Sequence, residues 1–236
     1  MSEKDTVNHF DKRQAESYDA RWQALAPLND SLHLQLSLVL EEAPEEARVL
    51  CVGAGTGAEL IALARRFSTW RFLAVDPSAP MLEVCRRKAE ANGVADRCAF
   101  HVGHVSDVPE AEGVFDAATS LLVSHFIVNL EERLRYFRDI RERLRPGGVL
   151  VTSDLCEAPR GQQAELMPVW LRMMRYAGAT SEQVEGMLTS YEQNVSMLPE
   201  QAMENLLIEA GFSHPTLYAQ SLLIRSWFAR AKQTHA

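Results

Sequence analysis

The chain has 236 residues, of which 47% are hydrophobic and 24% charged, and its formal net charge is −8. This length and composition are typical of a single α/β domain with a buried core. Because an acidic chain repels a phosphate backbone, no nucleic-acid partner is expected. The sequence has no apolar run of 18 residues, so neither a membrane span nor a membrane partner is expected.

The start of the chain and its cysteines indicate a compartment. Residues 1–5 do not begin a signal peptide, and the four cysteines contain no C-x-x-C pair. We therefore expect a cytoplasmic protein with reduced thiols. No group of His, Asp and Glu has metal-ligand spacing, so no metal site is predicted.

Two helical patterns open the chain, over residues 8–23 and 29–42. The second begins at the cap candidates Asn29 and Asp30 and ends before Pro44. Because the first strand pattern comes only after them, these helices are expected to be an addition to the α/β core.

A glycine-rich turn follows the first strand, which is expected at 48–53. The turn reads Gly53-Ala54-Gly55-Thr56-Gly57, and a helical pattern over 57–67 begins at once. The strand is a continuous apolar run, as in buried parallel strands. Glycines let the backbone approach a ligand closely, and the start of the helix offers free N–H groups.

The second strand, expected at 71–76, ends in Asp76, about 20 residues after the loop. A carboxylate at this place can accept both ribose hydroxyls of a nucleoside. It can instead cap the helix predicted over 78–91, because Pro77 comes next. The loop and the spaced acid together predict an adenosine-containing cofactor.

Strand and helix patterns continue to alternate after this point. Further strands are expected at 98–103, 114–120 and 148–154, with a helix at 130–144. Strands separated by helical runs imply a parallel sheet with crossover helices.

The C-terminal part breaks this alternation. Residues 157–197 are helix-like and rich in methionine and aromatic residues, and a further helix over 200–210 stops at Gly211. Two strands, at 216–222 and 223–229, close the chain.

The glycine loop resembles motif I of the class I S-adenosylmethionine-dependent methyltransferases. Three later segments, 74–78, 115–120 and 144–151, fit the same family in the same order. The resemblance covers roughly residues 45–155. It is favoured over a dinucleotide oxidoreductase, which stays an alternative because Gly53, Gly55 and Ala58 also match G-x-G-x-x-G/A.

This resemblance implies a fold of the α/β class. The expectation is a Rossmann-like seven-stranded methyltransferase sheet, mostly parallel with a C-terminal antiparallel strand, plus a helical lid. Residues 1–236 would form a single domain, and the expected parts are N-terminal helices and lid (1–45), cofactor-binding core (46–156), helical lid insert (157–198) and C-terminal helix and strand pair (199–236).

The resemblance also implies the cofactor, S-adenosyl-L-methionine, and the residues that bind it. Met81 can equally be a core methionine, and Tyr18 and Arg21 can equally belong to a surface helix. The full expected set is Tyr18, Arg21, Gly53, Ala54, Gly55, Thr56, Gly57, Asp76, Pro77, Met81, His104, Val105, Ser120 and Leu121.

Two positions depart from the family pattern. His104 stands where the family often has an acid that accepts the adenine amino group, and Cys51 stands where Asp or Glu commonly helps to bind the cofactor's ammonium group. These departures keep a non-catalytic cofactor-binding regulator as an alternative.

His125 follows the fourth strand and is the candidate catalytic base, because imidazole titrates near neutral pH. It can instead be a packed histidine that contacts the lid. The expected reaction is methyl transfer to a small-molecule acceptor held between residues 8–30 and 160–195. A homodimer is possible through the lid.

Residues 157–230 resemble the carboxy-S-adenosylmethionine synthases more specifically. The resemblance rests on the helices rich in methionine and aromatic residues, on Met187-Leu188 and on Gly211-Phe212. That family places an arginine near this stretch to hold carboxylates, whereas this chain has Glu185 and no arginine there. We therefore expect the shared architecture, and an enzyme that makes or uses carboxy-S-adenosylmethionine stays an alternative.

Overall fold

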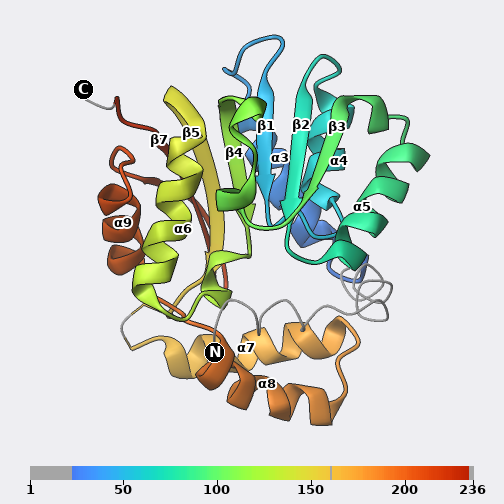
Figure 1. Ribbon diagram of the computed structural model, residues 1–236. Coiled ribbons are helices and arrows are strands. Elements are labelled where there is room, and N and C mark those ends of the chain that lie inside the picture. The colour runs from blue at the N-terminus through green and yellow to red at the C-terminus, as the bar shows by residue number, and fades with distance from the viewer. Residues whose placement is uncertain (1–22, 160, 234–236) are drawn as a thin grey trace.

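The computed structural model describes residues 23–159 and 161–233 (Figure 1). The helix expected at 8–23, with Tyr18 and Arg21, therefore lies almost wholly outside the described residues. The strands are β1 (Arg48–Val52), β2 (Arg71–Asp76), β3 (Cys98–Val102), β4 (Phe115–Leu121), β5 (Leu144–Leu155), β6 (Thr216–Ser221) and β7 (Ile224–Arg230).

These seven strands form one sheet in the order β3-β2-β1-β4-β5-β7-β6. The pairs among β1 to β5 are parallel, and β7 pairs antiparallel with both β5 and β6. The expected sheet, mostly parallel with a C-terminal antiparallel strand, is confirmed.

Helices cover both faces of the sheet (Figure 1). Side chains alternate between the faces along a strand. Accordingly Leu50 and Val52 of β1 join one buried cluster, and Val49 and Cys51 join the other. The helices are α3 (Ala26–Val39), α4 (Ala58–Arg66) and α5 (Ala79–Ala91) on the face of the second cluster, and α6 (Leu130–Glu142) and α9 (Glu200–Glu209) on the face of the first.

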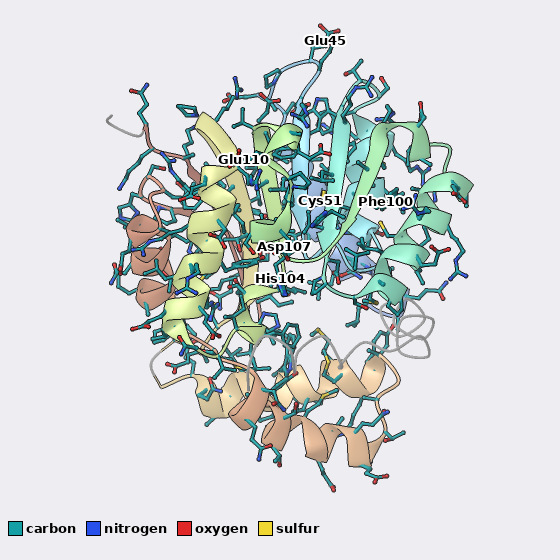
Figure 2. All side chains as sticks on the ribbon, viewed as in Figure 1. Glu45, Cys51, Phe100, His104, Asp107 and Glu110 are labelled. Atoms are coloured by element: carbon teal, nitrogen blue, oxygen red, sulfur yellow. The ribbon has the colours of Figure 1, made fainter. Side chains whose placement is uncertain are left out.

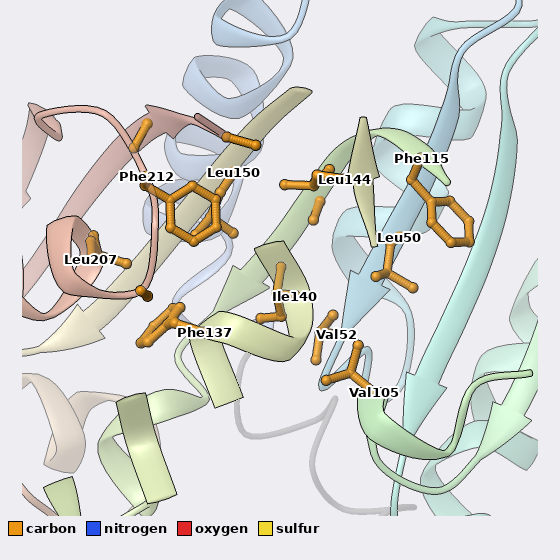
Figure 3. Packing of buried hydrophobic residues seen from close by; sticks show 14 of the residues in the cluster. Leu50, Val52, Val105, Phe115, Phe137, Ile140, Leu144, Leu150, Leu207 and Phe212 are labelled. Atoms are coloured by element: carbon orange, nitrogen blue, oxygen red, sulfur yellow. The ribbon is translucent and has the colours of Figure 1, made fainter. Parts of the chain in front are cut away.

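The first cluster contains four buried aromatic side chains, Phe115, Phe137, Phe212 and Trp227. Phe137 and Ile140 of α6 pack over Leu50 and Leu150, and Phe212 closes the cluster beside α9 (Figure 3). Each of these side chains has at most a trace of exposed surface. Burial of each contributes about 1.5–3 kcal/mol to folding.

Helices α7 (Gln163–Tyr176) and α8 (Ser181–Asn194) form a separate layer below the sheet (Figure 1). They have their own buried cluster, in which Trp170 and Met174 pack with Leu155, the last residue of β5, and with Leu25, next to α3. The layer therefore lies at the carboxyl ends of the central strands. In the described part of the chain no helix is long and apolar enough to cross a membrane.

Some predicted boundaries were wrong by a few residues. Helix α3 begins at Ala26, with a proline in its first turn and no side-chain cap, so Asn29 and Asp30 lie inside it. Strand β5 begins at Leu144, four residues before the predicted start: Leu144 pairs with Phe115, the register then shifts, and Gly147 and Gly148 bond to Ala231.

Candidate functional site

The glycine loop lies between β1 and α4 and is tied to the end of β2. The N–H groups of Gly53 and Ala54 both donate to the carbonyl oxygen of Val75, at 2.8 and 3.1 Å. Gly53, Gly55 and Gly57 have φ values of 66°, 52° and 80°. These are left-handed conformations that other side chains rarely adopt, so the backbone itself requires glycine here.

Packing adds a second requirement at Gly57. A Cβ atom placed on this residue would lie 2.3 Å from Sγ of Cys85 in α5. Such a contact requires the Cys85 side chain or α5 to shift, so Gly57 lets α5 pack closely against the loop.

Gly57→Ala should therefore destabilise the fold more than Gly147→Ala. Gly147 has a nearly identical φ of 78°, but a Cβ atom placed on it would meet no other atom within 4 Å. The left-handed backbone alone costs about 1–2 kcal/mol, and overpacking adds about 1–3 kcal/mol at Gly57. Urea unfolding of both variants measures the difference. Equal destabilisation would show that the Cys85 contact costs nothing.

Asp76 joins the loop to the start of α5. One carboxylate oxygen accepts the N–H of Gly55 and the other accepts the N–H of Ser78, both at 2.8 Å. The N-cap of α5 is Ser78, whose hydroxyl accepts from Met81 N, so the alternative of Asp76 as the cap is wrong. Pro77, between them, lies in the turn.

Each Asp76 oxygen has a second lone pair, so the carboxylate can accept two hydroxyl groups in addition to these N–H groups. Burial raises the pKa of Asp76, and the N–H bonds from Ser78 and Gly55 oppose this effect. The side chain is 8% exposed, which leaves it in a nearly closed site.

The other expected cofactor residues of this region gather around the loop. Met81 is buried, and its Cε lies 3.5 Å from the place of a Cβ on Gly55. Ala54 and Thr56 are buried, and Lys88 of α5 donates to the Thr56 hydroxyl at 3.4 Å. These side chains pack against the loop and hold it in place.

His104 lies at the end of the sheet nearest to α7 and α8 (Figure 2). The His104 ring accepts the backbone N–H of Asp107, and the Asp107 carboxylate accepts the N–H of His104 at 2.9 Å. Val105 is buried in the first cluster. One ring nitrogen of His104 thus has a structural role that the sequence did not reveal.

Cys51 and Glu59 make the neighbourhood of the loop unusual. Burial raises the pKa of Cys51 well above its ordinary value, so this thiol is not an anionic partner for an ammonium group. Burial, with help from nearby Asp76, raises the pKa of Glu59 to about 7, although Lys88 opposes the shift. Glu59 is 8% exposed and lies in the first turn of α4.

The raised pKa of Glu59 makes stability depend on pH. The carboxyl titrates near 4.5 in the unfolded chain, and its pKa in the folded protein is about 7. Ionisation therefore lowers the unfolding free energy progressively as the pH rises between these two values. Above this range the cost is about 3 kcal/mol. Glu59→Gln should therefore exceed the native protein in unfolding free energy at about pH 8 and equal it at about pH 4. Urea unfolding at both pH values measures this, and a variant that is less stable at the higher pH would contradict the expectation.

At the end of β4, Ser120 and Leu121 are held by neighbouring elements. The Ser120 hydroxyl is 2.7 Å from the hydroxyl of Tyr136, and its carbonyl accepts the Thr152 hydroxyl at 3.0 Å. Leu121 packs against the second cluster. The Ser120 carbonyl thus already has one hydrogen-bond partner.

His125 lies in a short helical turn, η5 (Ser124–Phe126), just after β4. Leu122, with a φ of 59°, reverses the chain so that this turn lies over β5. The Nδ1 atom of His125 is 3.0 Å from Oδ1 of Asp154, which also accepts the His125 backbone N–H at 2.9 Å. The sequence did not single out Asp154.

Asp154 is fully buried, and its side chain has two further contacts. Its Oδ2 accepts the Ser124 hydroxyl at 2.7 Å and lies 3.6 Å from a guanidinium nitrogen of Arg133. Burial alone would raise the pKa of Asp154, but Arg133, His125 and Ser124 together hold it below its usual value. Asp154 is therefore a carboxylate, and it can orient and stabilise a protonated His125.

Helices α7 and α8, the expected lid insert, are joined to each other by a hydrogen bond. The indole N–H of Trp170 in α7 donates to the hydroxyl of Tyr191 in α8 at 2.9 Å. Leu28 of α3 and Leu122, which follows β4, pack against the buried cluster that contains Trp170. In residues 23–159 and 161–233 no group of His, Cys, Asp and Glu side chains could hold a metal ion.

Several known proteins are similar to this chain. Residues 49–148 match the family model described as a methyltransferase domain. A demethylmenaquinone methyltransferase from Thermus thermophilus is 28% identical over 83% of this chain and 82% of its own. A carboxy-S-adenosyl-L-methionine synthase from Erwinia tasmaniensis is 28% identical over 89% of this chain and 86% of its own.

Solved structures share the fold. An O-methyltransferase family protein from Burkholderia thailandensis superposes with a TM-score of 0.66 at 13% identity, over 98% of this chain and 63% of its own. The chain thus spans less than two thirds of that structure's length. Residues 49–148 thus match a methyltransferase domain, and in its fold, its glycine loop and these relatives the chain is similar to the class I S-adenosylmethionine-dependent methyltransferases, enzymes whose methyl donor is S-adenosyl-L-methionine.

The residues present fit that cofactor. The three glycines form a cradle that a Cβ on Gly57 would disrupt, and Asp76 has two oxygens with spare lone pairs at its edge. The first turn of α4 adds N–H groups that favour a carboxylate.

Proposed function

We propose that this enzyme transfers the methyl group to a hydroxyl, enol or similarly acidic group of a small, largely apolar molecule. The observation that carries the proposal is the buried pair of His125 and Asp154 at the carboxyl ends of β4 and β5. A histidine whose Nδ1–H is held by a carboxylate presents Nε2 as a base. In the described part of the chain, nothing hydrogen-bonds to His125 Nε2.

The chain's own residues would bind, orient and remove a proton. S-adenosyl-L-methionine, when bound, supplies a methyl group on a positively charged sulfur. Asp76 would hold the ribose hydroxyls and the glycine loop would hold the methionine part, so that donor and acceptor are aligned. His125 would take the acceptor's proton at Nε2, and Asp154 would stabilise the imidazolium that forms.

The lid supports an apolar acceptor. Partly buried side chains pack around its cluster beside the base, among them Leu122, Met167 and Met187. Arg172 and Arg175 of α7, which could hold an acceptor carboxylate, are both exposed. The relative from Thermus thermophilus has demethylmenaquinone in its name, and an acceptor of comparable apolar character suits this lid.

The second candidate is an enzyme that makes or uses carboxy-S-adenosylmethionine. The relative from Erwinia tasmaniensis favours it, because the alignment extends through the lid. Glu185 of α8 argues against this candidate, because this exposed acid would repel the extra carboxylate of the carboxylated cofactor. Methyl transfer is therefore the better supported reaction.

Two measurements test the proposal. Mass spectrometry of the ligand that co-purifies with the protein should find S-adenosylmethionine or its demethylated product; the carboxylated cofactor would favour the second candidate. A panel of apolar phenols and hydroquinols should then yield methylated products, and carboxylated analogues of the same phenols should react less. Turnover of the carboxylated analogues alone would overturn the acceptor class.

A cytoplasmic location is also proposed. The four cysteines are all free thiols, and three of them are buried, as is typical of reduced proteins. A homodimer and the lack of a nucleic-acid partner stay predictions from the sequence.

A further inference from the structure

The lid segment, residues 157–198, leaves the core and returns to it at one place. Cys156 and Leu198 form a parallel bridge, and the N–H of Glu157 donates to the carbonyl of Leu198 at 3.1 Å. The two ends of the segment thus lie side by side and form a neck, defined here as residues 156–157 and 196–198.

Two buried arginines hold this neck, one at each end of the lid segment. Arg225 of β7 donates to the carbonyl of Glu157 at 2.7 Å and pairs with Glu200 at 3.1 Å. Arg133 of α6 donates to the carbonyl of Ser196 at 2.9 Å. Their exposed fractions are 1% and 0%. Each arginine therefore anchors one end of the lid from within the core.

Arg133 differs from Arg225 in what else it touches. Its Nε donates to the Ser124 hydroxyl at 2.8 Å, and that hydroxyl donates to Asp154. A second nitrogen of Arg133 lies 3.6 Å from the same carboxylate. Arg133 thus reaches Asp154, the acid that holds His125. The guanidinium of Arg225 contacts neither Asp154 nor His125.

The backbone of Ser196, at the returning end of the lid segment, bonds to both Arg133 and His125. Its carbonyl accepts from Arg133, and its N–H donates to the backbone carbonyl of His125 at 2.8 Å. The returning end of the lid is therefore bonded both to the base and to the arginine that fixes the base's partner.

We propose that Arg133 is a positioning residue that couples the returning end of the lid to the orientation of His125. A guanidinium is planar and its donors have fixed directions, so a shift of Ser196 that moves one donor of Arg133 moves the others with it. In a buried network each displaced partner weakens the others. Ordering of the lid over an acceptor then also sets the His125 ring. The inference rests on the proposed function only in taking His125 as the base.

The test compares Arg133→Met with Arg225→Met in the full chain, without any ligand. Both changes remove a buried guanidinium from the neck, but only the first removes contacts to Ser124 and Asp154, the network that holds the base. In protein labelled with ¹⁵N-histidine, the His125 ring signals are assigned by their loss in His125→Gln. The native protein should show one fixed tautomer, protonated at Nδ1. Hydrogen exchange reports the order of α7 and α8 in the same samples.

We expect both variants to exchange faster in α7 and α8, and only Arg133→Met to lose the single-tautomer pattern of His125. If Arg133→Met does not fold, Arg133→Lys replaces it in the comparison with Arg225→Met. Lysine keeps the positive charge but lacks the several N–H donors of a guanidinium. Native-like ring signals in the Arg133 variant would overturn the proposal. So would an equal disturbance in Arg225→Met, since loosening of the lid alone would then explain it.

This outcome is independent of the acceptor. If His125→Gln leaves methyl transfer intact, the role of His125 as base fails, while the ring signals still decide whether Arg133 couples the lid to it.

Discussion

Asp76→Ala should weaken S-adenosyl-L-methionine binding by about tenfold or more. The two ribose hydroxyls would lose a charged acceptor in a nearly closed site, at a cost of about 1.5–3 kcal/mol. The change also frees the N–H groups of Gly55 and Ser78, so the loop and the start of α5 lose their common anchor. Calorimetric titration with S-adenosyl-L-methionine measures the loss.

Asp116→Ala is the matched control for this change. Asp116 also joins two segments through its carboxylate, because it accepts the N–H of Arg48 at 2.8 Å and pairs with Arg145 at 2.9 Å. It lies near the start of β4, away from the glycine loop. The control should lose stability and keep its affinity; equal affinity losses in the two variants would assign the effect of Asp76 to folding.

The sequence pointed to the glycine loop and Asp76, the candidate cofactor half of the site, because their signals are local. The three glycines follow one strand directly, and Asp76 ends the next strand along the chain. Such patterns need no knowledge of distant contacts, since parallel strands bring their carboxyl ends to one edge. The same holds for the sheet, whose apolar runs alternate with helical ones.

The acceptor half could be predicted only in part, because its contacts are long-range. Asp154 lies 29 residues after His125, and Arg133 lies 63 residues before the carbonyl that it holds. The signal that was present is the polar run from Thr152 to Asp154 at the end of an apolar strand. Nothing in spacing alone says which loop such a run faces.

Boundary errors have equally specific causes. Proline in the first turn lets α3 begin at Ala26 without a side-chain cap, so Asn29 and Asp30 suggested a start that was too late. The Pro-Gly-Gly segment at the start of β5 looked like a turn, but tertiary pairing extends the strand through it: Leu144 pairs with Phe115, and Gly147 N donates to Ala231.

His125→Asn should lower turnover by about 10²–10⁴-fold if the acceptor loses a proton during transfer. The asparagine amide can replace Nδ1–H as the donor to Asp154, so the buried carboxylate keeps a partner, but the basic Nε2 is gone. His125→Gln places an amide near the position of Nε2 instead, and it cannot accept the proton either. Cofactor affinity should barely change in both, because the ring would face the acceptor.

His125→Ala separates the chemical role of this residue from a structural one. It leaves Oδ1 of buried Asp154 with only the backbone N–H of residue 125, so it should also lower the unfolding free energy, by about 1–3 kcal/mol. If the base is essential, Asn, Gln and Ala should share the same low turnover and differ in stability. Near-normal turnover in Asn and Gln would remove His125 from the mechanism, whereas lost cofactor binding in all three would make it a structural residue. An acceptor that is already deprotonated at the working pH predicts a third pattern, a smaller loss that shrinks further as the pH rises, because His125 would then only position the acceptor.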